Sequence, residues 1–160
     1  MRFTKRQLAA AAKSSVQMIA PSLQPDGDWT PMMLVAHHEE ITIVSLGMPD
    51  EEEWHFIRDV GIPSVLQQME GYAAALVYTA WQANFAADAP RELLERTGAA
   101  NHPKRKEVVT ILAVDESGRE GWTSEIMRRP GLSPDIGSWE PSNYKGGHVL
   151  EALLNGLGVQ

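Results

Sequence analysis

The 160-residue chain contains no cysteine, which excludes disulfide bonds, iron–sulfur clusters and thiolate zinc sites. A chain of this length can bury roughly 70% of the surface that its unfolded form exposes, so it needs no such cross-link to fold. The absence of cysteine is also compatible with a reducing compartment, and we expect a cytoplasmic protein.

Long apolar runs are also missing, because no stretch approaches the roughly 18–20 apolar residues that span a bilayer.

Acidic residues are missing from residues 1–25, which carry four basic side chains, whereas residues 26–70 hold ten acidic residues against one basic residue. The net charge of −7 argues against a protein that coats duplex nucleic acid, since such binding needs many basic contacts to phosphates. The separation of charge instead suggests surfaces of opposite sign that meet within the fold or between copies.

The N-terminal segment is predicted to be helical. Thr4 and Gln7 have the spacing of a capping box, in which each side chain satisfies a backbone N–H group at the start of a helix. Leu8 and Val16 fall near one face of that helix, and Pro21 ends it. The same basic segment has the composition of an amphipathic transit peptide, so a docked helix and a targeting segment are the two interpretations.

Two β-rich runs follow at residues 32–37 and 41–46, and they predict a hairpin that turns at residues 38–39. His38 and Glu39 are poor turn residues because neither favours a positive φ, so a longer turn is the alternative. The second run lacks strict alternation of apolar and polar residues, which is consistent with burial on both faces of the strand.

A second helix is predicted after this hairpin. Asp50 can cap it, and the acidic residues 51–53 complement the positive end of the helix dipole. The sequence Gly-Ile-Pro at residues 61–63 predicts a break, after which residues 64–69 resume the helix. Gly71 is expected to take the left-handed conformation that follows a helix end.

Residues 72–85 contain alanines, which favour helix, and β-branched and aromatic residues, which favour strand. We expect a strand, because small alternating alanines suit a sheet face on which a helix packs closely. A short helix is predicted at residues 90–97, where a proline begins the segment and Gly98 follows it.

The clearest hairpin joins residues 107–115 to residues 119–128 through a turn that ends at Gly118. Residues 132–144 are rich in proline and serine and are predicted to be irregular. Residues 147–157 have leucines at helical spacing and predict a short amphipathic helix.

Hairpins connect antiparallel strands, so these elements predict an α+β domain with an antiparallel sheet of about five strands flanked by helices. The order α-β-β-α-β-β-β-α is similar to the profilin-like and roadblock-type layout, and this resemblance of element order implies a dimerisation scaffold or a small-molecule sensor. Residues 1–131 are expected to form the domain. Residues 132–160 are expected to form an irregular linker and a C-terminal helix that docks on the domain or on a partner.

The strongest candidate for a metal site is His37-His38, which Glu39 and Glu40 follow, because imidazole and carboxylate groups suit zinc or iron. Adjacent residues of a strand point to opposite faces, however, so the two imidazoles cannot easily share one ion. The acidic residues 51–53 fan around a helix rather than converge. We therefore expect no metal and no other cofactor, with a metal-dependent hydrolase that uses His37 or His38 as a weaker alternative.

Common catalytic and nucleotide-binding motifs are absent from the sequence. No Gly-x-Ser-x-Gly pattern is present, and Gly146-Gly147 lacks the Gly-Lys-Ser/Thr ending of a phosphate loop. Gly156 and Gly158 lie too near the C-terminus to open a dinucleotide-binding unit. These absences favour a protein without catalytic activity, although residues from distant segments can still converge in space.

Basic residues gather at the open end of the clearest hairpin if Asp115 pairs with Arg119. In that register Lys106 faces Arg128, and like charges placed opposite each other are unfavourable unless something neutralises them. A bound anion or an acidic surface of the same chain or of a partner would do so. The predicted anion- or partner-binding site consists of Lys104, Arg105, Lys106, Arg128 and Arg129.

Tryptophans and leucines supply candidate contacts with other proteins. Tryptophans in loop-like segments beside prolines often anchor interfaces, and the leucines of the C-terminal helix could insert into a neighbour. The alternative is that these side chains complete the core of their own chain. The predicted interface residues are Trp29, Trp139, Leu150, Leu153 and Leu154.

Together these observations predict a small, non-catalytic interaction or accessory protein that self-associates, with a protein partner or a second copy as its partner. The alternative is a sensor or enzyme that binds a small anionic ligand at the basic hairpin end.

Overall fold

The computed structural model describes residues 2–82, 105–142 and 147–159. Its strands are β1 (Met32–His37), β2 (Glu40–Ser45), β3 (Ala73–Gln82), β4 (Lys106–Asp115), β5 (Gly118–Met127), β6 (Asp135–Ile136) and β7 (Glu140–Pro141). Its helical segments are α1 (Lys5–Ile19), η1 (Ala20–Ser22), α2 (Glu51–Phe56), η2 (Ile57–Gly61), α3 (Ile62–Met69) and α5 (His148–Leu157).

The predicted α+β class with an antiparallel sheet is confirmed. Within the part of the chain that the structure describes, the curled sheet has the order β2-β1-β3-β4-β5-β6, and β7 also pairs with β5. The expected number of about five strands is too low, because β6 and β7 arise in residues 132–144, which were predicted to be irregular. Each of these strands pairs with β5 over only two residues, too short a stretch for a visible sequence pattern.

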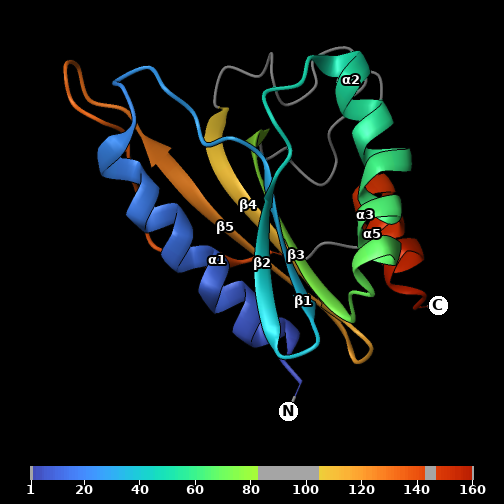
Figure 1. Cartoon of the computed structure of the whole chain (residues 1–160). Coiled ribbons are helices and arrows are strands. Elements are labelled where there is room, and N and C mark those ends of the chain that lie inside the picture. The colour runs from blue at the N-terminus through green and yellow to red at the C-terminus, as the bar shows by residue number, and fades with distance from the viewer. Residues whose placement is uncertain (1, 83–104, 143–146, 160) are drawn as a thin grey trace, which may run out of the picture.

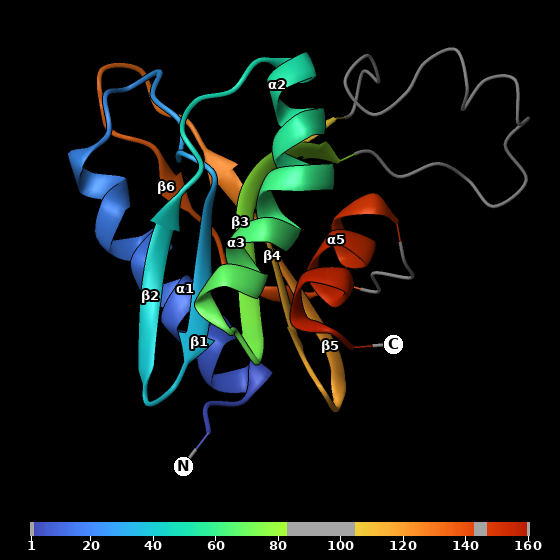
Figure 2. The same cartoon turned by 45° about the vertical axis from the view of Figure 1, so that its right-hand side comes forward.

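Helices cover both faces of the sheet (Figures 1 and 2): α1 lies on one face, and α3 and α5 lie beside each other on the other. Leu8 and Val16 of α1 are buried in the first layer of the core, and Leu66 of α3 and Leu153 of α5 are buried in the second. A strand between two such layers is apolar on both sides, which explains the nearly continuous apolar run at residues 108–114.

The start of α1 follows the predicted capping box. The Thr4 hydroxyl accepts a hydrogen bond from the Gln7 N–H group at 3.2 Å, and the Gln7 side-chain oxygen accepts one from the Thr4 N–H group at 2.8 Å. A carboxylate oxygen of Asp115 accepts a further bond from the Lys5 N–H group at 2.9 Å. The first turn of α1 is therefore fixed to the end of β4, far along the chain.

Each of the four basic side chains of the N-terminal segment contacts a partner within the chain. The Lys13 Nζ atom lies 3.3 Å from the centre of the Trp122 ring, and burial lowers the pKa of Lys13. The partners of Arg2, Lys5 and Arg6 are Tyr72, Asp115 and Glu120, respectively. All four partners lie outside the acidic segment of residues 26–70, so these contacts do not join the two oppositely charged segments.

The strand predicted at residues 72–85 is confirmed over Ala73–Gln82, whereas residues 83–85 and the helix predicted at 90–97 lie outside the described residues. Ala73 and Ala75 belong to the same core layer as Ala9 and Ala12 of α1. Small side chains on both elements let the helix approach the sheet closely. Packing therefore outweighs the intrinsic preference of alanine for helix.

His38 and Glu39 form the two-residue turn of the first hairpin, as predicted, with His37 paired to Glu40. His38 has a φ of 51° and occupies the first central position, where a type II′ turn usually has glycine. Strand β2 is exposed or half-buried along its whole length. Its burial on both faces is therefore not observed, because the strand order places β2 at the rim of the sheet.

The helical segment that begins after Asp50 is not interrupted at residues 61–63, so the predicted break is wrong. The η2 segment widens the helix into a π-helical turn, in which the Ile62 N–H group donates to the Ile57 carbonyl five residues earlier. Pro63 then falls in the first turn of α3, where a missing backbone N–H group costs little.

Helix α3 ends with a left-handed residue, but that residue is Glu70, with a φ of 56°, rather than the predicted Gly71. Gly71 serves another purpose, because a Cβ atom at this position would lie only 2.9 Å from the Val35 Cγ1 atom. The chain passes so close to β1 here that only glycine fits, and the helix turn is completed by Glu70 against its conformational preference.

The β4–β5 hairpin forms as predicted, but its register differs by one residue, with Asp115 paired to Gly118 rather than to Arg119. The Asp115 carboxylate accepts a hydrogen bond from the Ser117 N–H group at 2.7 Å, which tightens the turn to two residues. Gly118, with a φ of 136°, then opens β5 directly.

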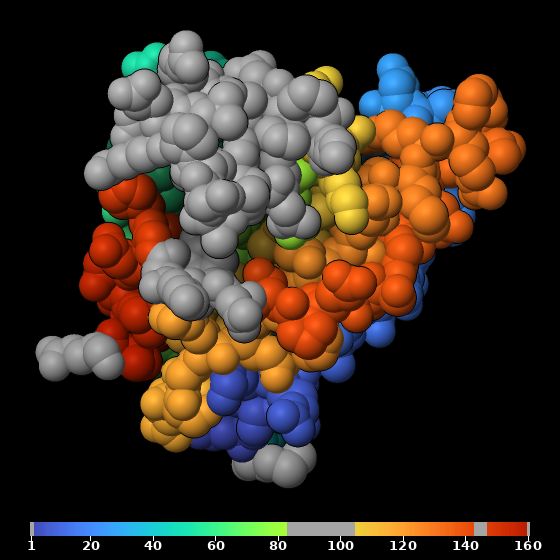
Figure 3. Space-filling model, turned by 180° about the vertical axis from the view of Figure 1, so that it is seen from behind, coloured from blue at the N-terminus to red at the C-terminus, as the bar shows by residue number. Residues whose placement is uncertain are grey.

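Helix α5 occupies the region predicted for the C-terminal helix and packs against α3, β3 and β4. Seen from behind in Figure 3, the segment of residues 132–142 lies at the surface beside β5, as the pairing of β6 and β7 with that strand requires. No helix in the described ranges is long and apolar enough to span a bilayer.

Candidate functional site

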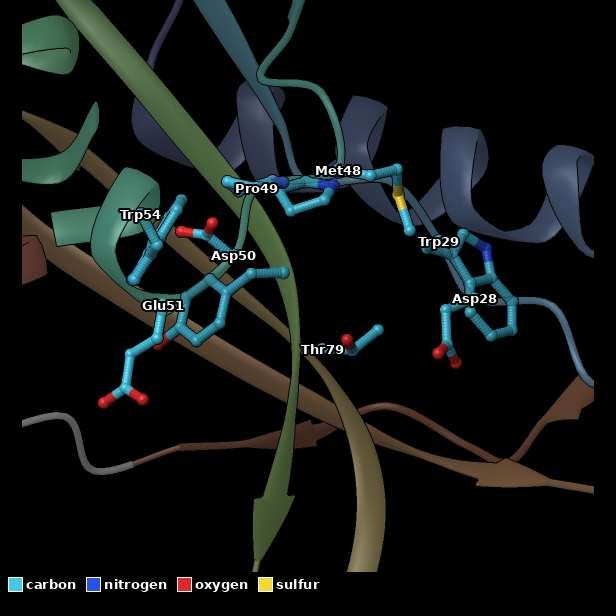
Figure 4. Close-up of a pocket in the computed structure, with 10 residues that line it drawn as sticks. Asp28, Trp29, Met48, Pro49, Asp50, Glu51, Trp54 and Thr79 are labelled. Carbon is cyan, nitrogen blue, oxygen red and sulfur yellow. The ribbon is translucent and has the colours of Figure 1, made fainter. Parts of the chain in front are cut away.

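A cavity of about 380 Å³ opens at the end of the sheet where β1 begins and β2 ends (Figure 4). This volume is near the lower limit of the roughly 300–1,000 Å³ that is usual for ligand pockets. The described residues that line it come from two loops, α2 and β3, and are Asp28, Trp29, Pro31, Met48, Pro49, Asp50, Glu51, Trp54, Tyr78 and Thr79.

One wall is the loop that enters β1, and Trp29 fixes it in place. The Trp29 side chain is only 1% exposed, and its indole N–H group donates to the Val16 carbonyl of α1 at 3.0 Å. The next residue reaches across to the opposite loop, because the Thr30 hydroxyl lies 3.4 Å from the Met48 sulfur. The two loops are thus linked at the rim of the cavity.

The other wall is the start of α2. The Asp50 carboxylate accepts a hydrogen bond from the Glu53 N–H group at 2.8 Å, and this bond holds the pKa of Asp50 below its usual range. Trp54, one turn further on, packs beside Tyr78 of β3, with the ring centres 6.5 Å apart and the rings tilted by 37°. Two aromatic rings therefore line the same cavity as the Asp50 carboxylate, whose ionised form is stabilised by this hydrogen bond.

The lining is acidic, since it contains the carboxylates of Asp28, Asp50 and Glu51 and no basic side chain among its described residues. Asp28 also forms an ion pair with Arg128, which approaches from outside the lining. Carboxylates and aromatic rings together attract cations, through charge and through the negative face of the ring. The cavity is chemically suited to a cationic or amphipathic group.

The basic residues of the predicted anion site do not converge in the way that the predicted register required. Lys104 lies outside the described residues. The guanidinium group of Arg105 lies over the Trp81 ring, 4.8 Å from its centre, and Lys106 Nζ is 3.9 Å from a Glu125 carboxylate oxygen. Lys106 does not face Arg128, because the observed register shifts β5 by one residue.

Arg128 is the most strongly paired of these cations. Its Nε atom donates to a Glu107 carboxylate oxygen at 2.9 Å, and its Nη1 atom donates to the Gly27 carbonyl at 3.0 Å. Hydrogen bonds to Glu107 raise the pKa of Arg128 above its usual value. Arg129 lies 3.9 Å from a carboxylate oxygen of Asp135. Acidic groups of the same chain therefore supply much of the neutralisation that an anion was expected to provide.

The predicted interface residues lie mostly within the chain's own core. Trp29, Leu150 and Leu153 are buried, and Trp139 and Leu154 are half-buried against the two core layers. Helix α5 therefore docks on its own domain, which was one of the two alternatives.

The paired histidines do not form a ligand cluster. The His37 Nε2 atom lies 2.6 Å from the Thr42 hydroxyl, across the hairpin. The His38 ring stands edge-on to the His37 ring, with the ring centres 5.9 Å apart. Across residues 2–82, 105–142 and 147–159, no group of three or more histidine, aspartate or glutamate side chains is arranged to hold a metal ion.

Comparison with known proteins found no matching family model, no similar curated protein and no similar solved structure. The likeness to profilin-like and roadblock-type domains thus stays a likeness of element order. The sequence assigned other roles to Trp29, Asp50 and Glu51, and it indicated none of the lining residues as part of a cavity. The available signal was the acidic segment of residues 26–70, which supplies all three carboxylates.

Proposed function

We propose that this chain is a non-catalytic interaction protein of the cytoplasm that self-associates through the outer edge of β2. The observation that carries the proposal is the place of β2 at the rim of the sheet, where it has β1 on one side and no strand on the other among the described residues (Figure 2). A free strand edge is a template for pairing with another chain.

The backbone groups that β2 offers can be assigned from the register. The Leu46 N–H group donates to the Pro31 carbonyl at 2.9 Å, which continues the alternation of the β1–β2 ladder. Because bonded positions alternate along an antiparallel strand, the even-numbered residues of β2 bond to β1. The backbone groups of Ile41, Ile43 and Ser45 therefore point outward.

The edge lacks two of the usual features that prevent pairing, and its charged residue, Glu40, lies at one end. Residues 40–45 contain no proline and no lysine, and three of the six are β-branched aliphatic residues. Ile43, at the centre, has 55% of its surface exposed. Burial of this side chain against a second copy would remove apolar surface from water.

An antiparallel arrangement around a two-fold axis fits this edge best. If Ile43 pairs with Ile43 of the second copy, outward-facing backbone groups meet each other and Ile41 faces Ser45. The acidic Glu39 and Glu40 then lie at opposite ends of the new pair, whereas a parallel arrangement would place them together. A single pair of six-residue edges is smaller than a standard interface of about 1,600 Å², so we expect a weak dimer with a dissociation constant in the micromolar range.

Sedimentation velocity across a concentration series tests the proposal. The wild-type chain should dimerise, and Ile43→Lys should be monomeric, because a charge at the centre of the edge opposes pairing. Met18→Lys is the matched control, since it replaces another exposed apolar residue, 79% exposed on α1, by the same charge. A monomeric wild-type chain, or an Ile43→Lys dimer as stable as wild type, would contradict the proposal.

The proposal does not extend to an anionic ligand or to a metal-dependent hydrolase. Arg128 and Arg129 form ion pairs within the chain, which does not favour an anionic ligand. His37 contacts Thr42, which does not favour a metal site.

A further inference from the structure

We infer that the acidic, aromatic cavity is a docking site for an extended peptide segment of a partner protein, which adds as a strand to the free end of β3 and places a lysine or arginine side chain between Trp54 and the carboxylates. The inference does not depend on self-association through β2, because the two sites share no residue.

The last residues of β3 have a described strand on one side only. The last pair between β1 and β3 joins Met32 to Val77, but β3 continues to Gln82. Over this extension β3 pairs with β4 on one side, and among the described residues it has no strand on the other. The cavity lies where β1 would continue, beside Thr79.

The hydrogen-bonding groups of that edge point away from β4, to the side on which no described strand pairs with them. Because the odd-numbered residues of β1 bond to β2, its even-numbered residues bond to β3, and their partners there have odd numbers. Thr79 and Trp81 continue this series beyond Val77. Their N–H and carbonyl groups are therefore directed away from β4, into the space that a peptide strand would occupy.

The side chains around the cavity are placed for an alternating peptide. Figure 4 shows Trp54, Asp50 and Glu51 on one side of β3 and Trp29 with Asp28 on the other. Side chains of a strand alternate between the two faces of a sheet. A peptide residue directly opposite Thr79 would point toward Asp28, and its two neighbours would point toward Trp54 and Glu51.

Charge and size select the class of peptide. Asp50 and Glu51 lie on the same side of β3 as Trp54, whereas Asp28 is already paired with Arg128. With no basic residue among the described lining side chains, a basic side chain is favoured over an acidic one beside Trp54. Trp54 and Tyr78 can contact the aliphatic stem and the charged group of such a side chain. A volume of about 380 Å³ suits an extended segment, whereas a helix with its side chains is about 10 Å wide.

The binding test uses a fluorescein-labelled pentapeptide, Val-Thr-Lys-Val-Thr, with blocked termini, and the same peptide with glutamate in place of lysine. Fluorescence anisotropy with the full chain should show saturable binding of the lysine peptide, at least tenfold tighter than that of the glutamate peptide. Binding should weaken as salt is added, since the attraction is partly between charges. Equal affinity for the two peptides, or no saturable binding of either, would overturn the inference.

Variants of the chain separate the backbone contact from the charge contact. Thr79→Pro removes the outward N–H group and leaves the ladder to β4 intact, as proline allows at an edge, and it should weaken lysine-peptide binding at least tenfold. Glu51→Gln should weaken it about two- to fivefold, as expected for one partly exposed ion pair. Glu52→Gln, which removes the neighbouring exposed charge outside the lining, should have no effect.

Two controls keep the test decisive. Ile43→Pro makes the corresponding change at the β2 edge, so it should leave peptide binding unchanged while it removes the dimer. If Thr79→Pro does not fold, a lysine peptide N-methylated at alternate residues blocks the same hydrogen bonds from the other side and should lose affinity. Strand addition is refuted if the wild-type chain binds the N-methylated peptide as tightly as the unmodified lysine peptide. It is also refuted if tetramethylammonium displaces the peptide fully at equal concentration, because the site then binds a cation alone.

Discussion

The guanidinium group of Arg128 holds the carboxylate of Glu107 by two hydrogen bonds, of 2.9 Å from Nε and 3.0 Å from Nη2. The same guanidinium also donates to the carbonyls of Pro25 and Gly27, at 3.3 Å and 3.0 Å, and pairs with Asp28. One side chain near the end of β5 therefore joins β4 to the loop that forms a wall of the cavity.

We predict that Arg128→Met lowers the free energy of unfolding by about 1–3 kcal/mol, because it leaves the three-quarters buried carboxylate of Glu107 without its partner. Urea denaturation measures this loss. Arg129→Met is the matched control, since Arg129 is 56% exposed and lies 3.9 Å from its partner, and it should change stability by less than about 0.5 kcal/mol. Equal losses in the two variants would show that the network around Arg128 adds nothing specific.

The same network shows why the predicted basic site differs from the observed arrangement. The sequence predicts correctly that Arg128 lies at the end of the second strand of the β4–β5 hairpin. A shift of one residue changes every cross-strand neighbour, however, and that shift depends on the bond from the Ser117 N–H group to Asp115. The contribution of Asp28 depends on how a distant loop packs, which no local pattern reveals.

A second prediction concerns the contact between α3 and α5. A Cβ atom at Gly156 would lie 2.7 Å from the Leu66 Cδ1 atom and 3.0 Å from the Pro63 Cα atom, so the two helices would have to separate. We expect Gly156→Ala to cost about 1–3 kcal/mol, as overpacking of a core does. Thermal and urea unfolding measure the change.

The control for this substitution is Gly61→Ala, at another helical glycine. A Cβ atom there would meet nothing closer than 3.9 Å, so alanine should be neutral or stabilise by up to about 1 kcal/mol through its helix propensity. If Gly156→Ala were as well tolerated as Gly61→Ala, α5 would not be docked as closely on α3 as the structure shows.

A third prediction is a gain in stability at the end of α3. Glu70 adopts a left-handed conformation, with a φ of 56°, that glycine adopts without strain. Glu70→Gly should therefore raise the free energy of unfolding by about 0.5–1 kcal/mol. Gln67→Gly, within the same helix and also exposed to solvent, should lower it by a similar amount. A loss in both variants would be inconsistent with the assigned end of the helix.

The elements that the sequence predicts well are those whose signals are local. The capping box of Thr4 and Gln7 and the cap at Asp50 each involve residues three apart, and both are observed. The rim position of β2 and the cavity beside Thr79 depend on strand order instead. An apolar run such as residues 41–44 has the same pattern whether its strand lies at the centre or at the edge of a sheet, so the site could not be found before the fold.

The fourth prediction concerns acid stability and depends on Asp115. Burial alone would raise the pKa of this carboxylate, but hydrogen bonds from Ser117 and from the Lys5 N–H group outweigh it, so the pKa of Asp115 lies below its usual range. A group whose pKa is lower in the folded chain stabilises the fold when it is ionised. Its contribution is complete above about pH 5 and disappears as the pH falls below about 4 toward the folded-state pKa.

Asp115→Asn should accordingly lower the free energy of unfolding by about 1–2 kcal/mol at pH 7, since it removes a charged acceptor that joins the start of α1 to the β4–β5 turn. The difference from wild type should shrink as urea titrations are repeated between about pH 5 and pH 2, because the wild-type carboxylate becomes neutral over this range. Asp135→Asn, with a carboxylate that is 56% exposed, should show little difference at any pH. A loss for Asp115→Asn that stays constant down to pH 2 would mean that the side chain stabilises the turn through its shape and not through its charge.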